Sequence, residues 1–396
     1  MKLDVDRWRD RPGVARILDA LGADRGLTRY VGGAVRDELL RIPINDIDFA
    51  TRLRPEDVVS RLVEARIKAV PTGIAHGTIT AVADGQPVEI TTLRADVSTD
   101  GRRATVEFSD DWRADAGRRD FTINALYADP RSGEIFDYFG GLEDLEARRV
   151  RFIGDPLQRI AEDHLRILRF FRFHARFGQG APDEAALDAC TLRANDLMAL
   201  SRERIADETL KTLGLPDPVA TIALMVGRGI FAPVLPEIKS PSRLAALVAD
   251  EAAAGIAPDS IRRLAALLPP DSAIADKVAA RLKLSKKARK RLAAAADPDL
   301  AANPRALAYW SGAETAIDRL LIARRPVDAA AIAGWPVPRL PISGGTLIKL
   351  GLTEGPAVAT ALKAIDRRWV VAGFPDGAAF DTLVSEELHR GGKGGA

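Results

Sequence analysis

The sequence predicts an α/β domain followed by an all-helical region. Residues 27 to about 150 contain short apolar runs bounded by turn residues, the pattern typical of strands. From about residue 155 onward, Ala, Leu and Arg recur with a helical period, and joints that contain proline interrupt the pattern. The two patterns divide the chain into a mixed first part and a helical remainder.

Within the first part, five runs are predicted as strands and one stretch as a helix. The helix is expected over residues 55–66, because Pro55 followed by two acidic residues favours a helix N-terminus. The polar segment Asp96–Arg103 is expected to be a loop. The strand runs are Arg29–Val31, Ile47–Thr51, Gly77–Ala83, Val88–Leu93 and Glu134–Tyr138.

Composition restricts the class of protein. With 396 residues, 47% of them hydrophobic, the chain can bury more than one core. The single cysteine, Cys190, excludes an internal disulfide framework and favours a cytoplasmic setting. No run approaches the roughly 20 apolar residues that a spanning helix requires, so no membrane segment is expected.

Residues 30–37 read as a short strand, two glycines and the start of a helix. Gly32 and Gly33 would let backbone N–H groups approach a phosphate. Arg36 lies one turn into the helix, where its delocalised charge suits a triphosphate. Taken alone, a Gly-Gly pair after a strand also suits a tight turn without a ligand.

Asp46 and Asp48 follow in a predicted strand. Residues two apart in a strand point to the same face, so the two carboxylates are expected to converge. Neighbouring carboxylates repel unless a cation lies between them, and oxygen ligands of this kind suit Mg²⁺. Glu89, on a predicted neighbouring strand, is either a third carboxylate facing the metal or an ordinary surface glutamate. A lone Asp-x-Asp also suits a solvated edge strand.

Four ordered blocks resemble the class II tRNA nucleotidyltransferase and bacterial poly(A) polymerase superfamily, and the resemblance covers residues 27 to about 210. The blocks are Gly-Gly-Ala-Val-Arg-Asp at 32–37 with Asp-Ile-Asp at 46–48, Arg-Arg-Asp-Phe-Thr-Ile-Asn-Ala-Leu at 118–126, Glu-Asp-His-Leu-Arg-Ile-Leu-Arg-Phe-Phe-Arg-Phe at 162–173, and Ser-Arg-Glu-Arg-Ile at 201–205.

The resemblance implies a polymerase β-like head with a mixed sheet and an all-α neck, body and tail. The head is expected at 1–150 and carries catalysis. The neck is expected at 151–215 and recognises the base, and the body and tail at 216–390 bind RNA. The implied reaction adds C, C and A to the 3′ end of tRNA from CTP and ATP, with Mg²⁺ at Asp46 and Asp48.

The resemblance also assigns nucleotide-binding residues. Arg119 is expected to hold the nucleotide, and Asp163 and Arg166 to read the Watson–Crick edge of its base. Three residues apart in one helix, Asp163 and Arg166 would be surface neighbours. Arg169 lies beside Arg166 and is expected to contact phosphate or base, whereas Arg172 has rotated away and also suits a structural ion pair.

One basic stretch in the helical region is a candidate RNA contact, because it could neutralise several phosphates. A solvated helix face explains it equally well. Its cationic residues selected for RNA binding are Lys283, Lys286, Lys287, Arg289, Lys290 and Arg291.

Other functions remain open at this point. A poly(A) polymerase of the same superfamily shares nearly every residue above, although residues 72–78 resemble CCA-adding enzymes more. A partial CC- or A-adding enzyme is a further alternative, and the loop at Asp100–Arg103 speaks against the CC-only type. A non-catalytic RNA-binding protein and a small-molecule nucleotidyltransferase fit the motifs less well.

Overall fold

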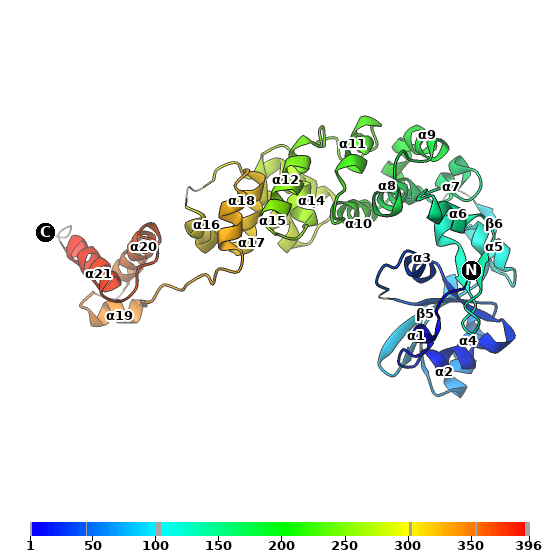
Figure 1. Ribbon diagram of the computed structural model, residues 1–396. Coiled ribbons are helices and arrows are strands. Elements are labelled where there is room, and N and C mark those ends of the chain that lie inside the picture. Colours follow the sequence, from blue (N-terminus) through cyan, green and yellow to red (C-terminus); the bar gives the residue numbers. More distant parts are fainter. Residues whose placement is uncertain (1, 45, 100–103, 301–302, 353–354, 393–396) are drawn as a thin grey trace. The chain divides into compact units, whose positions relative to one another are not determined.

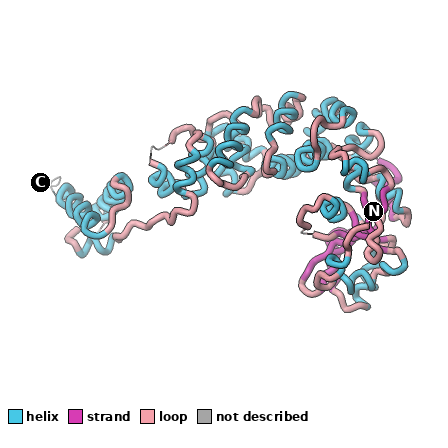
Figure 2. The backbone as a smooth tube through the Cα atoms, in the orientation of Figure 1, coloured by secondary structure: helices cyan, strands magenta, loops and turns pink. Residues whose placement is uncertain are grey.

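The computed structural model describes residues 2–44, 46–99, 104–300, 303–352 and 355–392 (Figure 1). The chain forms two compact units. The first contains the residues up to Thr212 together with Leu224–Val234, and the second contains Leu213–Ala223 and the residues from Leu235 onward. The first unit holds the strands, and the second is helical (Figure 2).

A seven-stranded mixed sheet in the order β3-β4-β5-β2-β1-β8-β9 forms the centre of the first unit, and β6 pairs with β7 separately. The strands are β1 (Thr28–Val31), β2 (Asp48–Thr51), β3 (Lys68–Gly73), β4 (Thr78–Ala83), β5 (Gln86–Thr92), β6 (Arg94–Thr99), β7 (Ala104–Phe108), β8 (Leu126–Ala128) and β9 (Ile135–Asp137). This arrangement confirms the predicted α/β head with a mixed sheet.

The strand β2 lies inside the sheet, antiparallel to β1 and parallel to β5. Its residues Phe49, Ala50 and Thr51 are buried, which fixes the strand in the core. The strand β4 alternates buried and partly exposed residues, as expected for one covered face. The buried β2 therefore holds Asp48, its first residue, against the neighbouring strands.

All five predicted runs contain strands, and α4 (Pro55–Glu64) occupies the predicted helix. The sequence analysis missed β3, β6, β7 and β8. The edge strand β3 is largely exposed and contains Pro71, so it has no apolar alternation, and β8 is only 3 residues long. Residues 96–99 of the expected loop belong instead to the strand β6, and Asp100–Arg103 lie outside the described residues.

Helices of the first unit surround the sheet and continue beyond it. They are α1 (Asp6–Arg9), α2 (Val14–Ala20), α3 (Gly33–Leu39), α4, α5 (Trp112–Gly117), α6 (Gly141–Glu146), α7 (Pro156–Glu162), α8 (Leu165–Phe177), α9 (Glu184–Leu192) and α10 (Arg202–Leu213), with single 3₁₀ turns η1 (Ala23–Arg25), η2 (Ile74–His76) and η3 (Thr122–Asn124) and a longer η4 (Ala194–Ala199).

The remaining helices form the second unit, apart from α11, which both units share. They are α11 (Val219–Gly227), α12 (Ser242–Ala253), α13 (Ser260–Leu267), α14 (Ser272–Arg281), α15 (Lys286–Ala295), α16 (Pro304–Ser311), α17 (Ala313–Ile322), α18 (Pro326–Ile332), α19 (Gly344–Lys349), α20 (Pro356–Val371) and α21 (Gly377–Gly392). Several begin at a capping side chain, such as Asp259, Asp271 and Ser285, which accepts hydrogen bonds from the first free backbone N–H groups.

A buried ion network holds the second unit together. The carboxylate of Glu251 accepts hydrogen bonds from Arg262 Nε at 2.7 Å and Arg263 Nε at 2.9 Å. All three residues are buried, as is Asp318, which lies 3.5 Å from Arg262. Each buried charge therefore has a partner of opposite sign, which offsets much of its desolvation cost.

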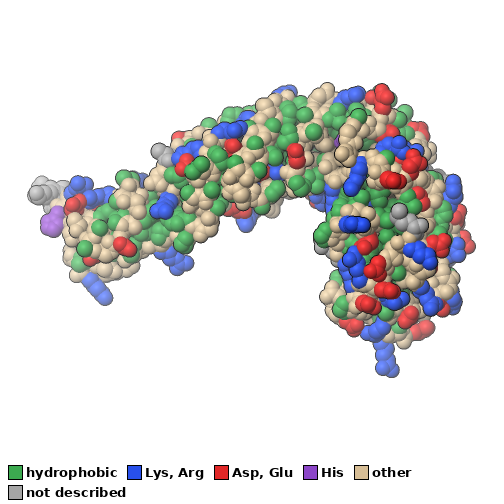
Figure 3. All heavy atoms as spheres, viewed as in Figure 1, with side chains coloured by type: hydrophobic (Ala, Val, Ile, Leu, Met, Phe, Trp, Pro, Cys, Tyr) green, Lys and Arg blue, Asp and Glu red, His purple; other side chains and the backbone are tan. Residues whose placement is uncertain are grey.

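One face of the molecule shows little segregation of charge (Figure 3). On the face drawn in Figure 3, acidic and basic side chains are interspersed. In the described ranges, no helix is long and apolar enough to cross a membrane.

We predict that Glu251→Ala lowers the free energy of unfolding of the second unit by about 3–5 kcal/mol, because it leaves two buried guanidinium groups without their shared carboxylate. Thermal and denaturant melts of the full chain measure the change. Asp276→Ala is the control, since it removes only an exposed pair with Arg289 and should barely move the melt. An equal effect of both variants would contradict this role for Glu251.

Candidate active site

The turn between β1 and α3 brings backbone close to a cavity. Gly32 has φ 69° and ψ −122°, a conformation that residues with a Cβ rarely adopt. Gly33 begins the helix, and both glycines line the cavity. The predicted strand, glycine turn and helix are therefore present, and the glycines leave room for a ligand beside the backbone.

Two predicted carboxylates lie on neighbouring strands. Asp48 of β2 is the direct parallel partner of Glu89 on β5. Burial, and after it the negative charges of Glu89 and Asp46, raise the pKa of Asp48 to about 6 against the opposing effect of Arg119. Asp46 was expected in the strand, but it lies two residues before β2 begins, and its side chain is exposed. The three carboxylates nevertheless act on one another electrostatically.

These carboxylates fit a divalent cation by their chemistry. Their ligand atoms are all hard oxygens, and a cation among them would relieve the repulsion that raises the pKa of Asp48. Among the described residues, no three Asp, Glu, His or Cys side chains converge into a complete ligand set. A bound cation would therefore share its coordination with water or substrate oxygens, as Mg²⁺ commonly does.

A buried acid, Asp115 of α5, fixes the two arginines of the second block. Its carboxylate lies 2.8 Å from Arg118 and 3.1 Å from Arg119, and it accepts a 2.7 Å hydrogen bond from the Tyr127 hydroxyl. Although burial opposes the effect, the guanidinium groups of Arg119 and Arg118 hold the pKa of Asp115 well below its usual range. The sequence analysis did not select Asp115. Its position just ahead of the Arg-Arg pair was the available signal.

Arg36 is buried beside the same cavity. Its guanidinium lies 2.6 Å from Asp37, donates to the side chain of Asn124, and stacks on the ring of Phe177 at 4.1 Å. Asp37 is also 3.5 Å from Arg176. Arg36 thus reaches the cavity from a restrained position instead of extending freely into it.

The base-reading segment differs from the predicted continuous helix. The helix α7 ends at Glu162, Asp163 is extended with φ −151°, and α8 starts at Leu165. The expected geometry of Asp163 and Arg166 on one helix face is therefore wrong. The break allows an Asp163 oxygen to accept the backbone N–H of Leu165 at 3.1 Å, which caps the new helix.

Asp163 and Arg166 are held by different partners. Arg204 of α10 donates to both carboxylate oxygens of Asp163, at 3.1 and 2.8 Å. Arg166 donates to Glu162 at 2.6 Å and to the backbone carbonyl of Arg118 at 2.8 Å. The sequence analysis placed Arg204 in a family block but did not select it, because nothing local shows that it reaches Asp163.

The two further arginines of α8 also have acidic partners. Arg169 donates to Asp120 at 2.8 Å through Nε, and Arg172 donates to Glu208 at 2.6 Å. Asp120 also accepts a hydrogen bond from the backbone N–H of Phe121. Arg169 lines the cavity, whereas Arg172 is not among the lining residues.

A single cavity of about 530 Å³ joins most of the predicted site. Asp46, Glu89 and Arg172 do not line it, and Arg118 and Arg204 do, although neither was selected from the sequence. The selected residues that line it are Gly32, Gly33, Arg36, Asp48, Arg119, Asp163, Arg166 and Arg169.

Comparisons with known proteins agree with this geometry. The model of the poly A polymerase head domain matches residues 28–151, and the model of the probable RNA and SrmB-binding site of polymerase A matches residues 181–240. The mitochondrial CCA tRNA nucleotidyltransferase 1 of Mus musculus is 33% identical over 91% of this chain and 87% of its own. The chain belongs to the CCA tRNA nucleotidyltransferase family.

A bacterial relative and a solved structure support the same membership. A CCA-adding enzyme of Anoxybacillus flavithermus is 40% identical over 53% of this chain and 51% of its own. The crystal structure of the Bacillus stearothermophilus CCA-adding enzyme in complex with CTP has a TM-score of 0.69 and 26% identity, and the match covers 97% of this chain and 100% of that one. The fold of the family therefore extends over nearly the whole chain.

The basic stretch lies in the second unit and is partly used internally. Arg289 of α15 pairs with Asp276 at 2.6 Å, and Arg291 with Asp318 at 2.6 Å. Arg291 is only 13% exposed and also lies 3.0 Å from Asp259. The selected lysines, by contrast, have exposed side chains: Lys283, Lys286, Lys287 and Lys290.

We predict that Asp48→Asn stabilises the metal-free protein. The folded pKa of about 6 lies above the unfolded value of about 3.9, so the native state binds the proton more tightly and its stability falls as pH rises from about 4 to 6. At pH 7.5 in EDTA, the variant should gain on the order of 2 kcal/mol in the free energy of unfolding. Denaturant melts measure it, and exposed Asp19→Asn is the control. A loss of stability at Asp48→Asn would refute the assigned repulsion.

Proposed function

We propose that this chain adds C, C and A to the 3′ end of tRNA from CTP and ATP and releases pyrophosphate. The supporting observation is the single cavity in which the acidic strand end of Asp48, the guanidinium of Arg119 and the pair Asp163 and Arg166 meet. Membership of the CCA tRNA nucleotidyltransferase family gives the cavity its substrates.

The carboxylates hold the metal in this proposal. Asp46 and Asp48 are assigned as ligands of Mg²⁺, and Glu89 as the third carboxylate because it directly neighbours Asp48 across the strands. The bound ion supplies Lewis-acid activation of the RNA 3′-hydroxyl and neutralises charge on the triphosphate. The role of the protein is to hold the carboxylates close together, which costs stability in the absence of the ion because their charges repel.

The triphosphate lies between the glycine turn and the arginines. Gly32 and Gly33 allow the phosphates to approach the backbone, and the guanidinium of Arg119 lies beside Gly32 in the same cavity. Arg119 is held by Asp115 and Tyr127, so its guanidinium is already oriented when the nucleotide enters. Arg36 and Arg169 add positive charge from restrained positions.

Asp163 and Arg166 read the base by complementary hydrogen bonding. Asp163 offers an acceptor for the exocyclic amino group that both cytosine and adenine carry, and Arg166 offers donors for a ring acceptor. In the free protein, Arg204 occupies both oxygens of Asp163. Binding of either base must therefore share or displace that contact. Arg172 supports this helix through its pair with Glu208.

The functional division of the chain follows from these roles. Residues 1–150 form the catalytic head, 151–215 the neck that recognises the base, and 216–390 the body and tail that bind the RNA. Within the body, the exposed Lys283, Lys286, Lys287 and Lys290 are the better RNA contacts. Arg289 and Arg291 pair with acidic side chains of the same unit.

The location is inferred from the chemistry of the chain. A single cysteine and no candidate membrane span among the described residues favour a cytoplasmic protein. The mouse relative is named as a mitochondrial enzyme, and the mitochondrion is also a reducing compartment.

We predict that Asp46→Ala abolishes nucleotide addition while leaving the fold intact. The assay supplies Mg²⁺, CTP and ATP to tRNA transcripts that end before CCA, after C or after CC, and sizes the products. Wild-type protein should extend each transcript to CCA and stop. The control is Asp57→Ala on the exposed face of α4, which should keep wild-type activity.

Other outcomes of this assay would change the assignment. Long tails made from ATP alone would identify a poly(A) polymerase, and growth that stops at CC or adds only A would identify a partial enzyme. Near wild-type addition by Asp46→Ala would remove Asp46 from the catalytic set.

We predict that Asp163→Ala weakens selection for cytosine and adenine, because the cavity loses its acceptor for their amino groups. Discrimination against UTP and GTP should fall by about 10- to 100-fold, the size of one to two hydrogen bonds to a charged group. Competition assays with pairs of nucleotides measure the ratio of kcat/KM values. Asp188→Ala, which removes an exposed pair with Arg228, is the matched control. Unchanged discrimination would exclude Asp163 from base reading.

A further inference from the structure

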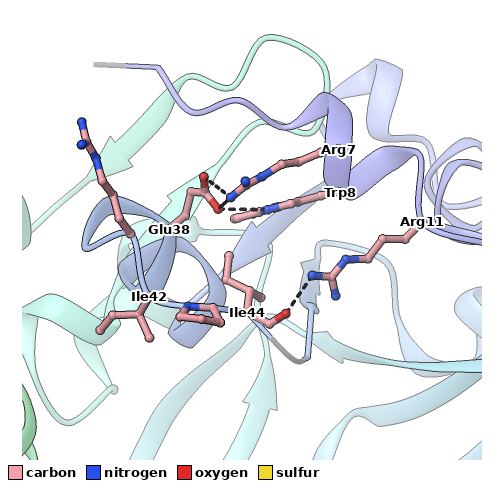
Figure 4. A pocket seen from close by; sticks show the side chains of 8 residues that line it. Arg7, Trp8, Arg11, Glu38, Ile42 and Ile44 are labelled. Carbon is pink, nitrogen blue, oxygen red and sulfur yellow. Dashed lines mark hydrogen bonds and ion pairs between the residues drawn. The ribbon is translucent and has the colours of Figure 1, made fainter.

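The N-terminal segment packs against the loop that leads to the catalytic carboxylates (Figure 4). Residues of α1 and Arg11 face the end of α3 and the following loop across a hollow of about 640 Å³. This hollow shares no lining residue with the nucleotide cavity. The N-terminal segment can therefore influence the nucleotide cavity only through elements that it contacts, such as the end of α3 and the loop that follows it.

One set of contacts reaches the end of α3. Arg7 forms an ion pair with Glu38, and the indole N–H of Trp8 donates to the same carboxylate at 3.3 Å. Trp8 is fully buried, whereas Arg7 is mostly exposed. The C-terminal end of the helix that follows the glycine turn is thus held by two side chains from the N-terminal segment.

A second set of contacts reaches β2. The ring of Trp8 packs edge-on against Tyr30 at 4.8 Å, and Tyr30 packs against Phe49 at 5.2 Å. Phe49 directly follows Asp48, and all three rings are buried. These packed rings hold β2 in place at the end of the loop that leads to Asp46.

The third contact is to the loop itself. A guanidinium nitrogen of Arg11 donates to the backbone carbonyl of Ile44 at 2.8 Å. Residues 42–44 belong to neither helix nor strand, so their position depends on contacts of this kind. Ile44 precedes Asp46 by two residues. A shift of its carbonyl is therefore transmitted along a short stretch of backbone to the carboxylate.

We infer that Arg11 is a positioning residue for the metal-binding carboxylate Asp46, an inference that rests on the proposed function of Asp46. The helix end and β2 are anchored by the other contacts, and Arg11 holds the connection between them. Without its hydrogen bond, the loop keeps both ends but loses a restraint on Ile44, two residues before the carboxylate. The variant protein still folds, but the carboxylate of Asp46 is no longer held in the position in which it binds the metal.

The test compares Arg11→Ala, Arg11→Lys and the control Arg9→Ala, which removes only an exposed pair with Asp6 on the same segment. Binding of Mn²⁺ to each full-length protein is measured by electron paramagnetic resonance, with Asp46→Ala as the reference for a lost ligand. Steady-state addition of CTP and ATP to tRNA gives kcat and KM, and thermal melts report folding.

For Arg11→Ala, we expect weaker Mn²⁺ binding and a fall in kcat of about 10-fold for both nucleotides with little change in KM, because a misplaced catalytic group costs rate more than binding. Arg11→Lys should recover part of both, since an ammonium group can donate to the same carbonyl. Arg9→Ala should match the wild type.

Wild-type Mn²⁺ affinity in Arg11→Ala, or equal losses in Arg9→Ala, would overturn the inference. If Arg11→Ala does not fold, Arg11→Lys decides: a folded lysine variant whose Mn²⁺ affinity and kcat both fall below wild type supports the inference, and one with wild-type values for both overturns it. If the wild type adds no nucleotide to tRNA, the proposed function fails, whereas the Mn²⁺ measurements still decide whether Arg11 positions Asp46.

Discussion

The parallel pairing of β2 with β5 is the constraint on which the active site depends. It places Asp48 directly beside Glu89, and the buried residues that follow Asp48 prevent the strand from moving away. Burial has the larger effect and the neighbouring like charges add to it, and together they raise the pKa of Asp48 to about 6. The fold therefore keeps an unfavourable arrangement in place until a cation relieves it. Catalytic sites commonly store free energy in this way.

The positive side of the site is ordered by buried acids. Asp115 orients Arg118 and Arg119, Asp120 orients Arg169, and Glu208 orients Arg172. An arginine in such a pair loses little further entropy when it meets a phosphate, because its planar fork is already fixed. The pairs also prevent the collected guanidinium groups from repelling one another. The motifs thus include partners whose purpose is to hold the ligand-binding residues.

The sequence predicted the head, the helical remainder and most of the cavity, because glycine turns, apolar periodicity and short motifs are local features. It failed where a contact joins distant segments. The helix break at Asp163 was missed, since the residues on either side are good helix formers and the pattern is continuous. Arg204 and Asp115 were missed as site residues for the same reason. In the basic stretch, the sequence could not show that Arg291 faces Asp318, 27 residues away.

The break at Asp163 also links the two halves of nucleotide recognition. A continuous helix would have pointed Asp163 along the surface, whereas the extended residue turns its carboxylate into the cavity. Arg166, the second residue of the new helix, donates to the carbonyl of Arg118, the residue before Arg119. Arg159 of α7 donates to the carbonyl of Gly117 at 2.8 Å. The segment proposed to read the base is therefore tied by hydrogen bonds to the backbone of residues 117–118, directly before Arg119, the residue proposed to hold the triphosphate.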